Sequence, residues 1–543
     1  MTSPLQDARA TDDGTSLRKD AGPPFRRVLV ANRGEIAVRI IRACRELGIE
    51  TVAVFSDADS EAGHVRAADQ AIRLGPAPAG ESYLRADLIV EAAKRTGAEA
   101  IHPGYGFLAE RASFAAAVED AGLTFVGPSS GAIARLGDKL AARRLAAGAG
   151  VPVVPGTLEP AAIDRPDGIA NIEAEARRIG FPLLVKTSAG GGGRGMRHVD
   201  VPGQLAEALA AGSAEAASTF GDGSVYIERV IAPARHIEVQ LIGDAAGTIV
   251  ALGERDCSLQ RRHQKLVEES PAPGLTDDER ATLHEMALRV ARMAGLRNAS
   301  TAEFLFDTER RFWFLEVNTR LQVEHGVSEL TAGIDLVREQ LQVAAGRSLS
   351  PGVVAAAARA VRPERHAIEV RISAEDPIRA FAPEPGRIGR WQMPSGPGIR
   401  VDTAVEAGDP VPPDYDPLIA KLLVVDGDRE GAIDRLARAL DEIEITGIQT
   451  TLPFHRFVAR HAGFRAGDLS TSWVADEWEP RVAADRAGAL AVAAQAAAAV
   501  AAGEVAAAPS SGGLTAPPNT TLRATPSSWR QSGLEDAADR WPG

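Results

Sequence analysis

Two carboxylates and an amide have the types and spacing of magnesium ligands. Glu303 lies in one short apolar run, and Glu316 and Asn318 lie at the end of the next. The turn-like segment Asp307–Arg311 between the runs predicts a β-hairpin, which would bring the three side chains together. Carboxylate and amide oxygens suit Mg²⁺, and nucleotide phosphates can complete its shell. A pair of solvated strand carboxylates is the alternative interpretation.

The same alternation of polar residues continues past this pair. If the strand persists, one of its faces carries a mixed polar set: Glu316, Asn318, Arg320, Gln322 and Glu324. A cation, an amide and a carboxylate together are what binding and deprotonating a small oxyanion require. A half-buried surface strand with one charged face is the alternative.

A glycine run follows the apolar, strand-like segment Pro182–Thr187. Five of the six residues Gly190–Gly195 are glycine, so their backbone N–H groups can fold around phosphate oxygens. Lys186 precedes the run and Arg194 lies inside it. No Lys-Ser/Thr pair follows, which excludes a Walker A loop. The alternative is a flexible linker.

The segment Glu254–Lys265 concentrates cationic and donor groups at its end, among them Arg261, Arg262 and His263. No aromatic residue interleaves them, and acidic neighbours surround them. These features favour an anion pocket over a nucleic-acid groove. None of the ten histidines has zinc-site spacing.

A regular alternation of elements must position these motifs. Short β-branched runs such as Val28–Ala31 and Thr51–Phe55 alternate with helical stretches such as Glu35–Leu47. Short connections of this kind predict a parallel sheet covered by helices. The stretch Ser130–Gly148 then predicts a helix that bridges to the next unit.

Two further units follow. The second begins near Val151 and contains the strand before the glycine run and another strand, Ser224–Val230. The third extends to about Trp478 and mixes strands with the helix Thr276–Gly295. Beyond it, the Ala-rich stretch Ala487–Ala508 predicts an exposed helix or linker, and the final Pro/Ser/Thr-rich tail buries too little apolar surface to fold alone.

Composition is that of a soluble globular protein of 543 residues, with a net charge of −13. This acidic balance argues against broad binding to nucleic acid or to an anionic membrane. Two cysteines and a polar N-terminus predict a reducing, cytoplasmic location. Only six of the 60 basic residues are lysines: Lys19, Lys94, Lys139, Lys186, Lys265 and Lys421.

Six segments, in this order, resemble biotin carboxylase, the ATP-grasp component of biotin-dependent acyl-CoA carboxylases. They are Val30–Ala37, His102–Leu108, Gly190–Met196, Glu254–Lys265, Glu316–His325 and Tyr415–Lys421. The likeness covers about residues 25–479. It implies an ATP-grasp fold of α/β and α+β type.

The resemblance also implies a division of the chain. It comprises a disordered tail (1–24), an N-terminal α/β domain (25–127), bridging helices (128–150), a small lid domain with the glycine loop (151–230), a larger C-terminal domain (231–479), and a linker with a disordered tail (480–543).

Roles for individual residues follow from the resemblance. ATP would contact Lys139, Lys186, Gly191, Gly192, Gly193, Glu228, Ile231, His236, Gln260 and His263. Mg²⁺ or Mn²⁺ would bind Glu303, Glu316 and Asn318. Bicarbonate would lie among Lys265, Arg320, Gln322 and the Val323 backbone, with Glu324 as general base. Arg371 would hold the anionic intermediate or biotin, and Tyr105 would border the biotin pocket.

The sequence departs from the family pattern near its catalytic segment. Gly326 stands where the family usually has Pro, and Arg229 stands where Lys is common. The loop Asp307–Arg311 is a residue longer than usual.

The expected activity is ATP-dependent carboxylation of biotin by bicarbonate through carboxyphosphate, the first half-reaction of an acyl-CoA carboxylase. None of the five methionines adjoins a lysine, so no biotin-acceptor motif is recognisable. We therefore expect biotin on a carrier protein or domain of another chain. A carboxyltransferase subunit and a second copy of this chain are the other expected partners. Another bicarbonate-activating ATP-grasp ligase, or a non-catalytic nucleotide-binding subunit, is the alternative.

Overall fold

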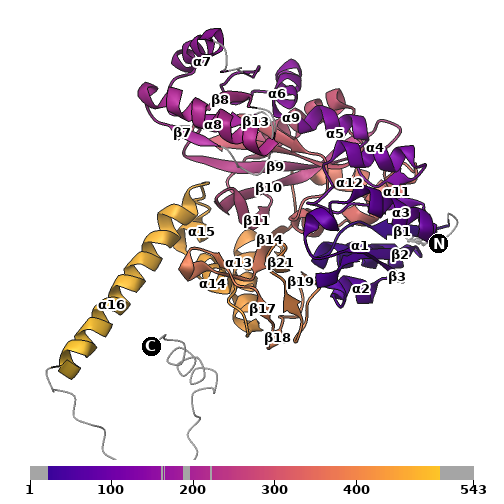
Figure 1. Cartoon of the computed structure of the whole chain (residues 1–543). Coiled ribbons are helices and arrows are strands. Elements are labelled where there is room, and N and C mark those ends of the chain that lie inside the picture. The colour runs from indigo at the N-terminus through magenta and orange to yellow at the C-terminus, as the bar shows by residue number, and fades with distance from the viewer. Residues whose placement is uncertain (1–21, 161–162, 164–165, 188–195, 221–222, 502–543) are drawn as a thin grey trace, which may run out of the picture. The chain divides into compact units, whose positions relative to one another are not determined.

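The computed structural model describes residues 22–160, 163, 166–187, 196–220 and 223–501 (Figure 1). The chain divides into two compact units, and the first ends at Val482. Sheets of five, three and eight strands organise that first unit, and they follow one another along the chain.

The first sheet has five parallel strands in the order β3-β2-β1-β4-β5. Its strands are β1 (Arg27–Val30), β2 (Glu50–Ser56), β3 (Gln70–Gly75), β4 (Ala100–His102) and β5 (Thr124–Phe125). Its helices are α1 (Gly34–Glu46), α2 (Gly63–Ala67), α3 (Ala86–Thr96) and α4 (Ala112–Asp120). Helix α1 buries Ile36 and Ile40 against Val28 of β1, as an amphipathic crossover helix should. The predicted parallel sheet is confirmed.

The stretch predicted as one bridging helix is two helices, α5 (Ser130–Gly137) and α6 (Lys139–Gly148). They meet at Asp138, whose side chain accepts a hydrogen bond from the Ala141 N–H and so begins α6. The break places Lys139 at the first position of α6.

The second sheet has three antiparallel strands in the order β7-β6-β8. They are β6 (Leu183–Thr187), β7 (Arg197–Val199) and β8 (Val225–Arg229). Helices α7 (Pro166–Ile179) and α8 (Leu205–Phe220) pack on it through an apolar core that includes Ile172 and Leu209 (Figure 1).

The third sheet has eight antiparallel strands in the order β13-β12-β9-β10-β11-β14-β21-β19. Their bounds are β9 (Ala234–Gly243), β10 (Ile249–Arg261), β11 (Gln264–Ser270), β12 (Asn298–Asp307), β13 (Phe312–Asn318), β14 (His366–Ser373), β19 (Ile399–Thr403) and β21 (Leu418–Asp426). Shorter strands are β15 (Glu375–Asp376), β16 (Ala382–Pro383), β17 (Gly386–Arg387), β18 (Trp391–Gln392), β20 (Pro410–Val411) and β22 (Glu444–Ile445).

Helices cover much of this large sheet. They are α9 (Asp277–Ala294), α10 (His325–Ala332), α11 (Leu336–Ala344), α12 (Pro351–Arg359), α13 (Arg429–Glu442), α14 (Leu452–Val458) and α15 (Ala462–Ala466). The helix predicted over Thr276–Gly295 is α9, because Thr276 and Glu279 form a capping box and Gly295 ends it with φ 62°. Helix α9 buries Leu283 and Val290 in a core with Phe304 of β12.

One local prediction is wrong. Strand β13 ends at Asn318, and residues 319–324 are irregular, with a bend at Arg320 and a turn at Val323 and Glu324. The Thr319 N–H bonds Glu110 instead of a neighbouring strand. The five alternating polar residues therefore do not share one strand face, although tertiary contacts still bring most of them together.

The last described element, α16 (Glu479–Ala501), lies where the sequence predicts an exposed helix or linker. Every residue from Ala483 to Gln495 is exposed. Among the described residues, no helix combines the length and the apolar character that a membrane span needs.

Candidate active site

Lys265 lies at the centre of a buried cluster of carboxylates. Its Nζ donates to Glu238 at 2.5 Å, to Glu324 at 2.7 Å and to Glu303 at 3.0 Å. Strands β9, β11 and β12 supply three of these side chains, and Glu324 immediately precedes α10. Burial alone would lower the pKa of Lys265, but the three carboxylates raise it well above its ordinary value. The ammonium is therefore a permanent positive charge in this pocket.

Glu324 is completely buried and lies between two cations. Arg371 Nη2 donates to its Oε2 at 2.9 Å, while Lys265 holds the other oxygen. Burial would raise the pKa of Glu324, but Lys265 and Arg371 hold it well below its ordinary value. The carboxylate therefore stays ionised and can accept a proton from a bound acid.

Arg371 is held from its other side by Glu268 of β11. The Arg371 Nε donates to Glu268 Oε1 at 2.6 Å. Glu268 is fully buried, and its Oε2 has no hydrogen-bond partner among the described residues. Burial and the charge of Glu324 raise the pKa of Glu268 to about 7, although Arg371 opposes the shift.

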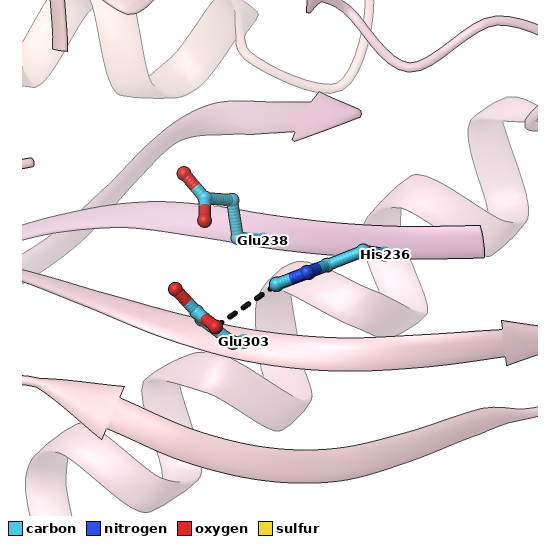
Figure 2. A group of neighbouring side chains, drawn as sticks. All are labelled: His236, Glu238 and Glu303. Carbon is cyan, nitrogen blue, oxygen red and sulfur yellow. Dashed lines mark ion pairs between the residues drawn. The ribbon is translucent and has the colours of Figure 1, made fainter. Parts of the chain in front are cut away.

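Glu303 accepts three hydrogen bonds and forms an ion pair with His236. Asn318 Nδ2 and Gln322 Nε2 donate to its Oε1 at 2.7 and 3.2 Å, beside Lys265. On the other oxygen, His236 Nε2 lies 2.9 Å from Oε2, as Figure 2 shows. Burial would raise the pKa of Glu303, but Lys265 and His236 lower it strongly.

The potential ligand atoms of His236, Glu238 and Glu303 lie within 4.8 Å of one another (Figure 2). The Lys265 ammonium already contacts both carboxylates, so a cation is present there without a metal. Glu316 is different: it lies directly opposite Glu303 in the β12–β13 register. Its nearest cation in the described part of the chain is Lys139, at 3.9 Å.

A divalent cation fits between the two opposed carboxylates. Like-charged side chains directly across a strand pair repel each other, and burial and Glu303 together raise the pKa of Glu316. Asn318, on the same strand as Glu316, adds an amide oxygen two residues further along. An all-oxygen donor set of this kind suits Mg²⁺.

Arg320 links this region to the first sheet. Its Nε donates to Glu110 at 2.9 Å, and its Nη1 donates to Gln322 Oε1 at 2.8 Å. Arg320 Nη2 also lies 3.4 Å from Asn318 Oδ1. The amides of Gln322 and Asn318 thus bridge Arg320 and Glu303.

The small sheet contributes a second charged group. Glu228 of β8 is buried and contacts Lys186 of β6 and Arg143 of α6. Burial raises its pKa, but these two cations lower it below the ordinary value. His263, in the turn between β10 and β11, has a lowered pKa because of burial and the nearby positive charge of Lys186.

The remaining predicted residues are less closely joined to Lys265. Gln260 is buried on β10, in register with Lys265. Ile231 follows β8 and is half-buried. Gly191, Gly192 and Gly193 lie outside the described residues.

The backbone of Val323 and the ring of Tyr105 lie near a further buried lysine. Lys421 Nζ donates to the Val323 carbonyl at 2.8 Å and lies 3.2 Å from Glu35 Oε1. The Tyr105 hydroxyl bonds the same Glu35. The Val323 carbonyl is thus engaged with Lys421, beside Glu324.

Family models match most of the chain. The biotin carboxylase N-terminal domain matches residues 24–133, the ATP-binding domain of the carbamoyl-phosphate synthase L chain matches 138–351, and the biotin carboxylase C-terminal domain matches 369–476. Biotin carboxylase 1 of Bacillus subtilis (strain 168) is 47% identical over 455 residues, 83% of this chain and 98% of that protein. The chain belongs to the biotin carboxylase family. It is therefore an enzyme of the ligase class.

Other relatives agree. A pyruvate carboxylase subunit of Methanothermobacter thermautotrophicus is 46% identical over 85% of this chain and 91% of its own length. The biotin carboxylase domain dimer of Hydrogenobacter thermophilus 2-oxoglutarate carboxylase, with MgADP, ADP and bicarbonate, has a TM-score of 0.79 and 43% identity, covering 84% of this chain and 98% of that one. A Campylobacter jejuni biotin carboxylase–β,γ-ATP complex also has a TM-score of 0.79, with 41% identity over 83% and 99% of the two chains. These matches establish the ATP-grasp biotin carboxylase fold.

Two acidic residues of the site are absent from the predicted set. Glu238 and Glu268 are fully buried and bind Lys265 and Arg371, yet neither is among the predicted site residues. A signal for Glu238 exists, because polar residues alternate with apolar ones along β9 although the strand is buried. Glu268 offers no such signal, since an adjacent Glu269 obscures which face is polar.

Proposed function

We propose that this biotin carboxylase transfers a carboxyl group from bicarbonate to biotin on a carrier protein, with cleavage of ATP to ADP and phosphate and through carboxyphosphate. The arrangement that carries this proposal is the ionised Glu324 between Lys265 and Arg371. A base and two fixed cations in one water-poor pocket match the needs of bicarbonate, an anion that must be held and deprotonated before it attacks.

The acid pair Glu303 and Glu316, with Asn318 nearby, would hold Mg²⁺. When bound, the ion neutralises charge that develops on the transferred phosphoryl group. Lys139 of α6 and Lys186 of β6 would contact the nucleotide phosphates, while His236, Gln260 and His263 would lie along the nucleotide. The contacts of Gly191, Gly192 and Gly193, and that of Ile231 beside Glu228, stay predictions from the family resemblance.

Lys265, Arg320, Gln322 and the Val323 backbone would hold bicarbonate for attack on the γ-phosphorus. Glu324 would remove its proton, which makes the oxygen a better nucleophile. Its low pKa means that it is ready as a base across the physiological range. The γ-phosphoryl group then passes from ATP to a bicarbonate oxygen, so that ADP leaves and carboxyphosphate forms.

Carboxyphosphate would break into CO₂ and phosphate, and that phosphate would take the proton from the ureido nitrogen of biotin. Arg320 would stabilise the resulting biotin enolate oxygen. Arg371 would hold the anionic intermediate, with Tyr105 at the border of the biotin pocket. Closure of segment 151–230 as a lid would exclude water, which otherwise hydrolyses carboxyphosphate.

The chain's partners are also part of the proposal. A biotin carrier protein or domain on another chain would deliver biotin, a carboxyltransferase subunit would use the product, and two copies would form a homodimer. The dimeric Hydrogenobacter domain supports the last point. The final acceptor stays open: an acyl-CoA is expected from the resemblance, whereas two relatives are named for pyruvate and 2-oxoglutarate. The free thiols Cys44 and Cys257 support a reducing cytoplasm.

Bicarbonate-dependent ADP release by the purified chain tests the proposed function. We expect free biotin to stimulate it, and Glu324→Gln to abolish that stimulation because an amide cannot accept the proton. The same substitution at Glu254, whose buried carboxylate binds Arg280 and His284 instead, is the matched control for loss of a buried charge. A wild-type enzyme without biotin stimulation, or a fully active Glu324→Gln variant, would refute the proposal.

A further inference from the structure

The basic segment at the end of β10 is divided between two faces of one hairpin. Gln260 pairs in register with Lys265, and Arg261 pairs with Gln264. Because side chains alternate along a strand, Lys265 faces the catalytic carboxylates while Arg261 and Gln264 face the opposite side. Arg261 and Gln264 therefore lie on a second face of the predicted anion-binding segment, which the proposed chemistry does not use.

This second face of the hairpin lines a cavity of about 320 Å³. Arg261, Arg262 and Gln264 form one wall, and the loop from Glu375 to Pro383 forms the other. The loop adds Arg379, which is paired with Glu384 at 3.2 Å, so three arginines and one carboxylate line the cavity. In a chain with a net charge of −13, this is a local reversal of sign.

Arg261 is the strongest indication of a ligand. Its side chain is only 14% exposed and lies over the Phe381 ring, with 5.0 Å from the guanidinium carbon to the ring centroid. Its Nε is buried without a hydrogen-bond partner in the described part of the chain, and its ion pair with Glu479 is long, at 3.6 Å. Buried donors are almost always satisfied, so an anion in the cavity would complete this group.

The loop that supports Arg261 is strained. Ala380 and Phe381 both adopt left-handed backbone conformations, with φ of 58° and 57°. Residues with a Cβ avoid this region, and successive examples are unusual outside functional sites. The strain brings the ring of Phe381 beneath the guanidinium. Glu375, across the cavity, has its pKa raised to about 7 by burial and by Asp416, so its negative charge is weakened.

We propose that this cavity binds a carboxylate side chain of the biotin carrier, an inference that rests on the proposed function. The partner must supply negative charge, because the cavity walls are positive. It must also approach the chain beside Lys265, because the β10–β11 hairpin forms both the cavity wall and part of the catalytic pocket. Asp416, next to Glu375, belongs to the 415–421 segment that contributes Lys421 to the site.

Steady-state kinetics with two forms of biotin test the proposal. Full-length Arg261→Gln and Arg262→Gln would each be compared with wild type, using free biotin and the biotinylated carrier that co-purifies with the chain. We expect the KM for the carrier to rise about tenfold, as loss of an interfacial charge pair allows. The kcat/KM for free biotin should stay within about twofold, because free biotin has no group to place in the cavity.

The second cavity variant and one control variant separate loss of docking from loss of packing. Arg262 is exposed, so its substitution tests the cavity without disturbing the packing on Phe381. Arg390→Gln removes an equally exposed arginine outside the cavity and should leave the carrier KM unchanged. An unchanged carrier KM in both cavity variants, or equal losses with free biotin and carrier, would overturn the docking proposal. A wild-type chain inactive with free biotin would instead refute the proposed function itself.

Discussion

Glu268 should control the activity of Arg371 without touching substrate. Glu268→Gln keeps the shape of the side chain but replaces a charge-assisted hydrogen bond to Arg371 Nε, 2.6 Å long, by a neutral one. That difference is about 1–2 kcal/mol, which predicts a biotin-dependent rate about 5- to 30-fold lower. Arg371 would then be held by a charged partner from one side only, by Glu324.

The pH dependence provides the diagnostic readout. Burial and Glu324 raise the pKa of Glu268 to about 7, so the carboxylate is protonated below that pH and its hold on Arg371 weakens. We expect the wild-type rate to fall as pH drops through about 7, and the variant to be slow but flatter over the same range. The groups facing Glu268 are Arg371 and Glu369 on β14, Glu324 before α10, and Lys265 on β11.

The assay is biotin-dependent ADP release between about pH 5.5 and 9, measured together with ADP release in the absence of biotin. Glu269→Gln is the matched control, because this neighbouring carboxylate points to Arg429 and His366 instead. Its kcat should be unchanged. A Glu268→Gln enzyme with the wild-type rate and pH profile would refute the reasoning, and so would equal losses in both variants.

Three further outcomes follow from the same contacts. Lys421→Met leaves the buried Glu35 without its cation and should lower the free energy of unfolding by about 3 kcal/mol in urea titrations, with partial recovery when Glu35→Gln is added; no recovery would contradict the pairing. Burial would raise the pKa of Glu269, but His366 and Arg429 outweigh this effect and lower it from 4.5 to about 2. Its stabilisation of about 3 kcal/mol is present above pH 4.5 and lost as pH falls toward 2, so Glu269→Gln should flatten the acid-unfolding curve, and an unchanged curve would refute this. Glu316→Gln should raise the Mg²⁺ concentration for half-maximal activity about tenfold or more in a Mg²⁺ titration, whereas an unchanged requirement would exclude Glu316 as a ligand.

Much of the fold could be predicted because local patterns carry it. Four of the five parallel strands follow from β-branched runs between helices, whereas β3 is not among the predicted strands, and α9 is bounded by caps that are visible in the sequence. The β12–β13 hairpin was also predictable, and its register sets Glu303 opposite Glu316. The break at Asp138 was not, because its effect depends on a cap rather than on periodicity.

The site was predictable where its residues lie close together along the chain. It was less predictable where contacts between distant segments decide the backbone path or the partner of a side chain. The strand alternation past Asn318 failed because Glu110, from the N-terminal region that carries the first sheet, captures the Thr319 N–H. Residue types were still correct, since Gln322 and Glu324 reach Glu303 and Lys265 through the turn. The role of a buried acid such as Glu238 depends on the cation that it binds across the sheet, and no local pattern specifies that partner.

In the proposed reaction, bicarbonate attacks the γ-phosphorus of ATP with Glu324 as base. Incubation of the enzyme with ATP, biotin and ¹⁸O-labelled bicarbonate, followed by mass analysis of the released phosphate, tests this directly. We expect one bicarbonate oxygen in each phosphate formed, because carboxyphosphate breaks between its carbon and its bridging oxygen. Phosphate that takes its new oxygen from water instead would exclude attack by bicarbonate.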